Sequence, residues 1–275
     1  MLESEERERI EIEMLLEAIF RLYGHDFRNY AYSSIRRRIW HRVHAERLDT
    51  ITGLAERVIH DRTCMNRLLA DMTIHVTEMF RDPEVFHTFR TQVVPILRTY
   101  PFIRVWHAGC STGEEVYSMA ILLHEAGLYE KTRIYATDTN ADVLNIAREG
   151  VYPLERMQHY TRNYMEAGGT EAFSNYYTAR YDSVIFHSFL KKNMVFGQHN
   201  LVTDGSFNEF NVILCRNVMI YFNKDLQDHV HRLLYNSLSM FGILNLGTKE
   251  SINFTSHAED YEDLDSQSRL YRKIK

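Results

Sequence analysis

Two glycines and two carboxylates fall within one short segment, RVWHAGCSTGEEVYSMA, at residues 104–120. The apolar start, the small residues and the periodicity that follows predict a strand, a tight turn and a helix. Gly109 and Gly113 would let the backbone of the turn approach a ligand closely. Glu114 and Glu115 would repel a diphosphate, and the segment matches neither GxGxxG nor a P-loop. Carboxylates there suit hydroxyls, an amine or a sulfonium, although they are also favourable at any helix N-terminus.

A further acid, Asp138, ends the next predicted strand, 25 residues after Gly113. This spacing is close to the roughly 20 residues that separate the glycine turn from the ribose-binding acid in nucleotide-binding folds. Asp138 could instead cap the following helix. Taken together with the turn, it favours an adenosine-containing cofactor without phosphates. S-adenosylmethionine is the commonest cofactor of that kind.

Two other segments place polar groups near the same edge of the predicted sheet. In NVILCRNVMIYF, residues 211–222, a buried strand ends before Arg216 and Asn217. The segment lacks the [DN]PP[YF] motif of enzymes that methylate nucleic-acid bases, and we expect no nucleic-acid substrate. In TIHVTEMFRDPEVF, residues 73–86, Thr77 and Arg81 would share a face if the segment were helical. The forked donors of Arg81 suit a carboxylate, although a local ion pair with Asp82 or Glu84 is an equal alternative.

The segments VTEMFRDPEVF, AGCSTGEEVYS and CRNVMIYF, the last followed by NKDLQ, resemble the chemotaxis glutamate O-methyltransferase (CheR) family. The resemblance runs from about residue 30 to the end of the chain. It implies an N-terminal helical domain and a class I methyltransferase domain, whose mostly parallel sheet is Rossmann-like and carries a small antiparallel β insertion. It also implies methyl transfer from S-adenosylmethionine to glutamate side chains of chemoreceptors.

Carried over position by position, the resemblance assigns roles to individual residues. Arg81 and Tyr221 would lie at the reacting centre, and Thr77 and Arg81 at the methionyl end of the cofactor. Glu115 and Asp138 would bind its amine or ribose side, and Asn200 and Leu201 would flank the adenine. The full predicted cofactor-binding set is His75, Thr77, Arg81, Gly109, Glu115, Asp138, Asn200, Leu201, Arg216 and Asn217. The family often has Asn where this chain has His75.

A basic segment precedes these motifs. Residues 28–47 hold six arginines and one glutamate, a net charge of +5, whereas the whole chain carries −5. Such segregation fits a docking surface for an acidic partner such as a receptor's helical cytoplasmic domain, although a solvated helix face would look the same. The residues predicted to bind the substrate protein are Arg37, Arg38 and Arg42.

The composition limits the alternatives. No apolar run approaches the roughly 20 residues that span a bilayer, so we expect no membrane insertion. Three cysteines without CxxC spacing favour a reducing cytoplasm over a disulfide framework. The sequence contains neither an HExxH nor a CxxC pattern, so it does not predict a metal site. The alternatives that stay open are a methyltransferase for another protein or a small carboxylic acid, and a non-catalytic cofactor-binding signalling module.

The apolar periodicity divides the chain into three parts. Residues 1–75 read as a helical domain, 76–103 as a linker and helix contributing to the active site, and 104–275 as the catalytic domain. Strands are predicted at 103–106, 133–137, 211–215 and 243–246, and helices at 114–127, 141–148 and 224–240. Short β segments at about 168–198, including Met194, Val195 and Phe196, predict the antiparallel insertion. The insertion could dock a receptor's C-terminal peptide. The tail at residues 259–275, which ends in SRLYRKIK, is predicted to form a last edge strand.

Overall fold

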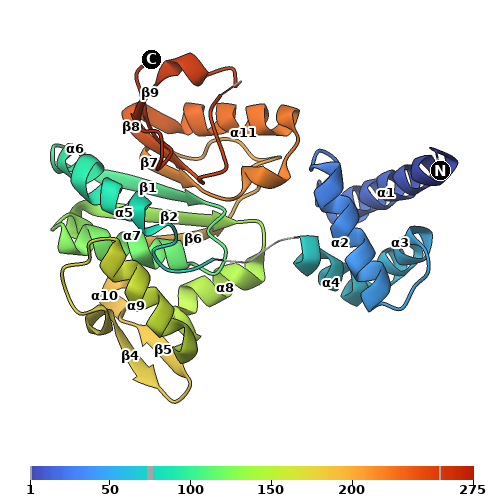
Figure 1. The fold of residues 1–275 in the computed structure, drawn as a ribbon, viewed down its shortest axis with the longest axis horizontal. Helices are drawn as coiled ribbons and strands as arrows, with labels where there is room; N and C mark the ends of the chain where they lie inside the picture. The colour runs from blue at the N-terminus through green and yellow to red at the C-terminus, as the bar shows by residue number, and fades with distance from the viewer. Residues whose placement is uncertain (1, 73–76, 254) are drawn as a thin grey trace. The chain divides into compact units, whose positions relative to one another are not determined.

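The computed structural model describes residues 2–72, 77–253 and 255–275. The chain separates into two compact units. One contains Met1–Ile74 and Tyr221–Gln227, and the other contains His75–Ile220 and Asp228–Lys275. Figure 1 shows the helices of the first unit and the sheet of the second.

The first unit is helical. It contains α1 (Leu2–Tyr23), α2 (Tyr32–Ala45), α3 (Ile51–His60) and α4 (Arg62–Met72). Gly24, at φ +75°, ends α1, and the Thr50 hydroxyl accepts a hydrogen bond from Gly53 N at the start of α3. The apolar faces of the helices meet in a core that includes Leu15, Ile39 and Leu54. The backbone at 221–223 joins this unit, since Tyr221 O accepts from Ala31 N.

The second unit is built on a seven-stranded sheet in the order β6-β2-β1-β7-β8-β10-β9. The strands are β1 (Ile103–Ala108), β2 (Thr132–Asp138), β6 (Met194–Gln198), β7 (Phe210–Cys215), β8 (Leu238–Leu246), β9 (Tyr261–Asp265) and β10 (Leu270–Lys273). The first five strands of the order are parallel, whereas β10 and β9 are antiparallel to their neighbours. This is the predicted class I methyltransferase fold.

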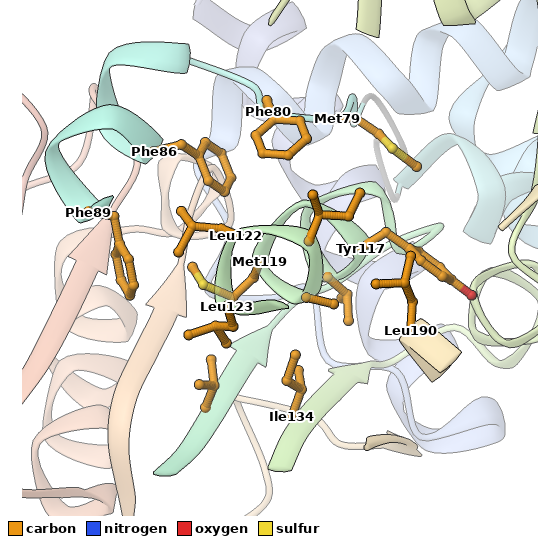
Figure 2. Close-up of a cluster of buried hydrophobic side chains, with 14 of the residues drawn as sticks. Met79, Phe80, Phe86, Phe89, Tyr117, Met119, Leu122, Leu123, Ile134 and Leu190 are labelled. Atoms are coloured by element: carbon orange, nitrogen blue, oxygen red, sulfur yellow. The ribbon is translucent and has the colours of Figure 1, made fainter. Parts of the chain in front are cut away.

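Helices cover both faces of the sheet. They are α5 (Pro83–Thr88), α6 (Val94–Arg98), α7 (Glu114–Glu125), α8 (Ala141–Glu149), α9 (Met157–Glu166), α10 (Ser188–Lys191) and α11 (Lys224–Ser237), with a π-helical turn at Phe89–Val93. The connections through α7 and α11 lead from the middle of the sheet in opposite directions. Because such crossovers are right-handed, α7 and α11 lie on opposite faces (Figure 1). The core between α7 and the sheet includes Met119, Leu122 and Ile134 (Figure 2).

A separate three-stranded antiparallel sheet, in the order β3-β5-β4, confirms a small antiparallel β insertion, although β3 lies before the predicted bounds of about 168–198. Its strands are β3 (Val151–Pro153), β4 (Tyr177–Arg180) and β5 (Ser183–Phe186). The prediction was wrong about Met194, Val195 and Phe196, because β6 pairs in parallel with β2 in the main sheet. A short apolar run does not reveal its pairing partner.

Three smaller expectations also need correction. The last strand, β10, lies between β8 and β9 and is not an edge strand. Helix α11 ends at Ser237, and Met240 belongs to β8. Residues 77–82 are turn rather than helix, with Phe80 at φ 51° and Asp82 at φ 55°. Side-chain spacing alone does not show left-handed backbone in a residue other than glycine.

Candidate functional site

The turn after β1 is packed tightly against its surroundings. Gly109 and Gly113 have φ of +80° and +92°, a region that favours glycine. A Cβ at Gly109 would lie 2.5 Å from Cγ2 of Val218, and one at Gly113 would lie 2.8 Å from Cβ of Ala147. The backbone N–H groups of Gly109 and Cys110 both donate to Thr137 O in β2. The turn is therefore fixed at the carboxyl edge of the sheet, where ligands of open α/β sheets bind.

The carboxylate of Asp138 faces this turn from the end of β2. Its Oδ2 accepts from Ser111 N at 2.9 Å and its Oδ1 accepts from Asn140 N at 3.0 Å. The residue that caps α8 is Asn140, whose side chain accepts from Asp142 N, so Asp138 is not the cap. Each half-buried carboxylate oxygen can accept a further hydrogen bond, which suits ribose hydroxyls.

A buried ion-pair network joins the loop after β7, the first turn of α7 and the segment before α5. Arg216, after β7, donates from Nη1 to Glu115 Oε2 at 2.8 Å and from Nη2 to Asp82 Oδ2 at 2.7 Å. Nδ1 of His107 lies 2.9 Å from Glu115 Oε1. Burial would raise the pKa of Glu115, but the charge of Arg216 and the hydrogen bond from His107 outweigh it and lower that pKa to about 2. Glu115 is therefore a fixed anion at neutral pH.

The two neighbouring glutamates have different environments. The Glu114 side chain is 1% exposed, accepts from the Thr112 hydroxyl at 2.6 Å and lies 3.8 Å from Nη1 of Arg156. Burial is the largest effect on Glu114 and raises its pKa. Glu114 thus anchors the turn to neighbouring elements, whereas Glu115 keeps 18% of its side chain exposed.

The turn after β7 depends on a carboxylate that sequence reasoning did not single out. Glu250 accepts from four backbone N–H groups, those of Asn217, Met219, Ile220 and Gly247. Asn217 has φ 62°, a left-handed conformation that its N–H bond to Glu250 helps to hold. The only sequence signal is an acid shortly after a buried strand, which is too common to identify the role.

Asn200 and Leu201 follow β6 at the same edge. The Asn200 side chain accepts from Val202 N at 2.9 Å, and Leu201 is buried. The preceding residue, His199, donates its backbone N–H to Asp138 O and packs edge to face on Trp106. The structure thus brings Gly109, Glu115, Asp138, Asn200, Arg216 and Asn217 to the loops that follow four adjacent strands.

Sequence models of two domains match nearly the whole chain. One, described as the CheR methyltransferase SAM-binding domain, covers residues 75–269, and the other, the CheR methyltransferase all-alpha domain, covers 10–73. The chain belongs to the CheR methyltransferase family. Its cofactor is S-adenosylmethionine, as predicted, and the half-buried carboxylate of Asp138 and the close-packed glycine turn fit that cofactor.

Relatives within the CheR family bear related names. A Pseudomonas putida protein provisionally named methyltransferase Cher3 is 50% identical over 98% of this chain and 99% of its own length. Chemotaxis protein methyltransferase 2 of Pseudomonas aeruginosa is 28% identical over 90% of this chain and 89% of its own. The chemotaxis protein methyltransferase of Salmonella typhimurium is 31% identical over 70% of this chain and 63% of its own.

The remaining predicted cofactor residues precede α5. His75 lies outside the described residues. Thr77 and Arg81 are both half-buried, and Arg81 O accepts from Nη2 of Arg216 at 3.1 Å. Asp82, one of the two acids considered as a partner for Arg81, pairs with Arg216.

The predicted substrate-binding arginines differ in exposure. Arg37 is exposed, whereas Arg38 is buried, donates to Met72 O and stacks 4.6 Å over the Tyr221 ring. Arg42 donates to Asp71 and Glu46, and 12% of its side chain is exposed. Much of the positive charge of this segment is thus balanced within the helical unit, where Glu8 pairs with Arg36 as well.

No helix in the described parts of the chain is both long and apolar enough to cross a bilayer. Among the same residues, no three His, Cys, Asp or Glu side chains are grouped as a metal site.

Proposed function

We propose that this methyltransferase esterifies glutamate side chains of chemoreceptor cytoplasmic domains. The observation that carries the proposal is the match to both CheR domains together with relatives named chemotaxis protein methyltransferases. The three cysteines are free and buried, which fits a cytoplasmic protein.

The roles of the site residues follow the arrangement at the carboxyl edge. Asp138 accepts from the ribose hydroxyls of the cofactor, and Glu115 attracts its ammonium group. Asn200 and Leu201 flank the adenine. The remaining proposed contacts come from His75, Thr77, Arg81, Gly109, Arg216 and Asn217.

The proposed reaction requires no proton transfer to or from the protein. S-adenosylmethionine supplies a methyl group bound to a sulfonium. A glutamate carboxylate, with an ordinary pKa near 4.3, is already ionised at neutral pH and needs no general base. Orientation and removal of water are then the main contributions, worth up to roughly 7–11 kcal/mol in well-aligned systems. Arg81 and Tyr221 are the proposed groups that orient the acceptor carboxylate.

Two surfaces are proposed to meet the receptor. Arg37 on α2 is an exposed cation that suits an acidic helix. The second is β4, one of the two edge strands of the small sheet, where Thr178, Ala179 and Arg180 are exposed. An edge strand of this kind can accept a peptide as an added strand, which would tether a receptor's C-terminal segment.

The direct test is to map the modified atoms. Purified protein, S-adenosylmethionine and a receptor cytoplasmic fragment are incubated, and the fragment is digested and sequenced by mass spectrometry. Methyl groups on glutamate side chains support the proposal, and a matched fragment whose modified glutamates are changed to alanine should gain none. Methylation confined to amines, or to small carboxylic acids added to the reaction, would overturn it.

A further inference from the structure

Helix α9 contacts the segment that carries Thr77 and Arg81. Nε2 of His159 lies 2.7 Å from Oε2 of Glu78, within hydrogen-bond distance. One turn further along α9, the Asn163 amide donates to Met79 O at 3.0 Å. Asn163 is only 5% exposed, so this bond satisfies a buried carbonyl.

The next residue of the segment, Phe80, is held by the same helix. Its ring packs edge to face on Tyr164 of α9, with centroids 5.3 Å apart, and also on Phe86 (Figure 2). Its N–H donates to the Ser118 hydroxyl at 2.9 Å. Phe80 has φ 51°, a left-handed conformation that costs about 1–3 kcal/mol and persists only when its surroundings enforce it. Thus α9 contacts three consecutive residues, Glu78, Met79 and Phe80.

Residues shortly before α9 also contact the turn after β1. Arg156, directly before α9, lies 3.8 Å from Glu114, and the hydroxyl of Tyr152 in β3 donates to Thr112 O at 2.8 Å. Two segments that carry predicted cofactor residues, 77–82 and 109–114, are therefore both contacted by groups between 152 and 164.

We propose that α9 positions the cofactor site, with His159 and Asn163 as positioning residues for Thr77 and Arg81. The inference rests on the proposed cofactor contacts of those two residues. Without the two bonds, the segment loses two anchors directly before its left-handed residue Phe80. Thr77 and Arg81 then spend less time in the binding conformation, and the apparent affinity for cofactor falls with that fraction.

The test is the affinity for S-adenosylhomocysteine, measured by calorimetry beside the melting temperature. Asn163→Leu keeps the side-chain size and removes the donor. It should raise the dissociation constant by about ten-fold, a typical coupling between linked sites. Met165→Ala is the matched control, because Met165 lies on α9 and is 69% exposed. A lower melting temperature with unchanged affinity would make the contact purely structural and overturn the inference.

If Asn163→Leu fails to fold, the partly exposed pair of Glu78 and His159 provides a second test. Glu78→Ala and His159→Ala should each weaken S-adenosylhomocysteine binding, and the double variant should weaken it no further, since each removes the same contact. Additive losses, or no loss, would contradict the inference.

This outcome is separable from the proposed substrate. Binding of S-adenosylhomocysteine requires no receptor, so a protein that binds it but leaves receptor glutamates unmodified refutes the substrate and not the role of α9. The proposed function and this inference both assume that Thr77 and Arg81 contact the cofactor. Thr77→Ala and Arg81→Ala test that assumption. Unchanged affinity in both would remove the basis of the inference.

Discussion

Arg216 after β7 and Glu115 in the first turn of α7 form a buried ion pair, with Nη1 2.8 Å from Oε2. The pair joins the start of α7 to the loop after β7, although the two residues are 101 positions apart in the sequence. Because Arg216 also binds Asp82, it holds the segment before α5 to the same edge of the sheet. One guanidinium thus connects three of the segments that carry predicted cofactor residues.

Removing the charge of Glu115 should destabilise the protein. Glu115→Gln leaves the Arg216 guanidinium, 1% exposed, with a weaker partner, and breaking a buried pair typically costs about 3–5 kcal/mol. Urea unfolding measures the loss. Glu130→Gln is the control, since Glu130 pairs with Lys192 and its side chain is 76% exposed. Equal stabilities for both variants would show that the buried pair contributes nothing beyond an exposed one.

Asp138→Ala should weaken S-adenosylhomocysteine binding by at least ten-fold. Hydrogen bonds to a charged group are worth roughly 1.5–3 kcal/mol each, and the ribose would lose its acceptor. Calorimetry on the folded variant is the measurement, with Asp142→Ala, an exposed acid on α8, as control. Wild-type affinity in Asp138→Ala would remove Asp138 from the site.

Stability should fall as the pH is lowered from 6.5 to 4 because of His231. Burial is the largest effect on this side chain and lowers its pKa from 6.5 to about 4. In this window the unfolded chain binds the proton and the folded chain does not, so protonation favours unfolding. The shift corresponds to roughly 3 kcal/mol, fully present above pH 6.5 and lost by pH 4.

His231→Leu should flatten this pH dependence, as measured by urea unfolding at several pH values. His229→Leu, two positions earlier on α11 and exposed, should keep the wild-type slope. A His231→Leu slope equal to that of the wild type would show that other groups cause the acid sensitivity.

The arginines of α2 should separate into docking and structural groups. Arg37→Glu should raise the Michaelis constant for receptor several-fold at low ionic strength, with less effect as salt screens the charge. Arg42→Glu should destabilise the helical unit instead, because it places a third acid beside Asp71 and Glu46. Arg62→Glu, an exposed charge reversal on α4, is the control for nonspecific effects. Receptor kinetics that are identical for Arg37→Glu and Arg62→Glu would assign no docking role to Arg37.

Buried strands and glycine turns were predictable from the sequence, whereas long-range pairing was not. Strand β7 is buried without polar alternation from Val212 to Cys215, which is typical of a parallel sheet covered on both faces. The run at β6 has the same appearance as β4 and β5, and only its pairing with β2 assigns it to the main sheet. Short apolar periodicity does not contain that information.

The pairing of charged side chains was likewise not predictable from local sequence. The arginines at 28–47 form a basic cluster in the sequence, but Arg36 pairs with Glu8 and Arg42 with Asp71, acids 28 and 29 positions away. Likewise, Glu250 holds the turn at Asn217 from 33 positions further along. Local spacing indicates which side chains are candidates for the site, and the fold determines which of them are already paired.

The central claim is that the product is a carboxylate ester on a receptor. Methyl-labelled S-adenosylmethionine is incubated with the protein and receptor-containing membranes, and the washed membranes are treated with alkali. The account predicts volatile labelled methanol, reduced strongly by Asp138→Ala and absent when receptor is omitted. Label that stays on the protein through alkaline treatment would indicate methylated amines and contradict the account.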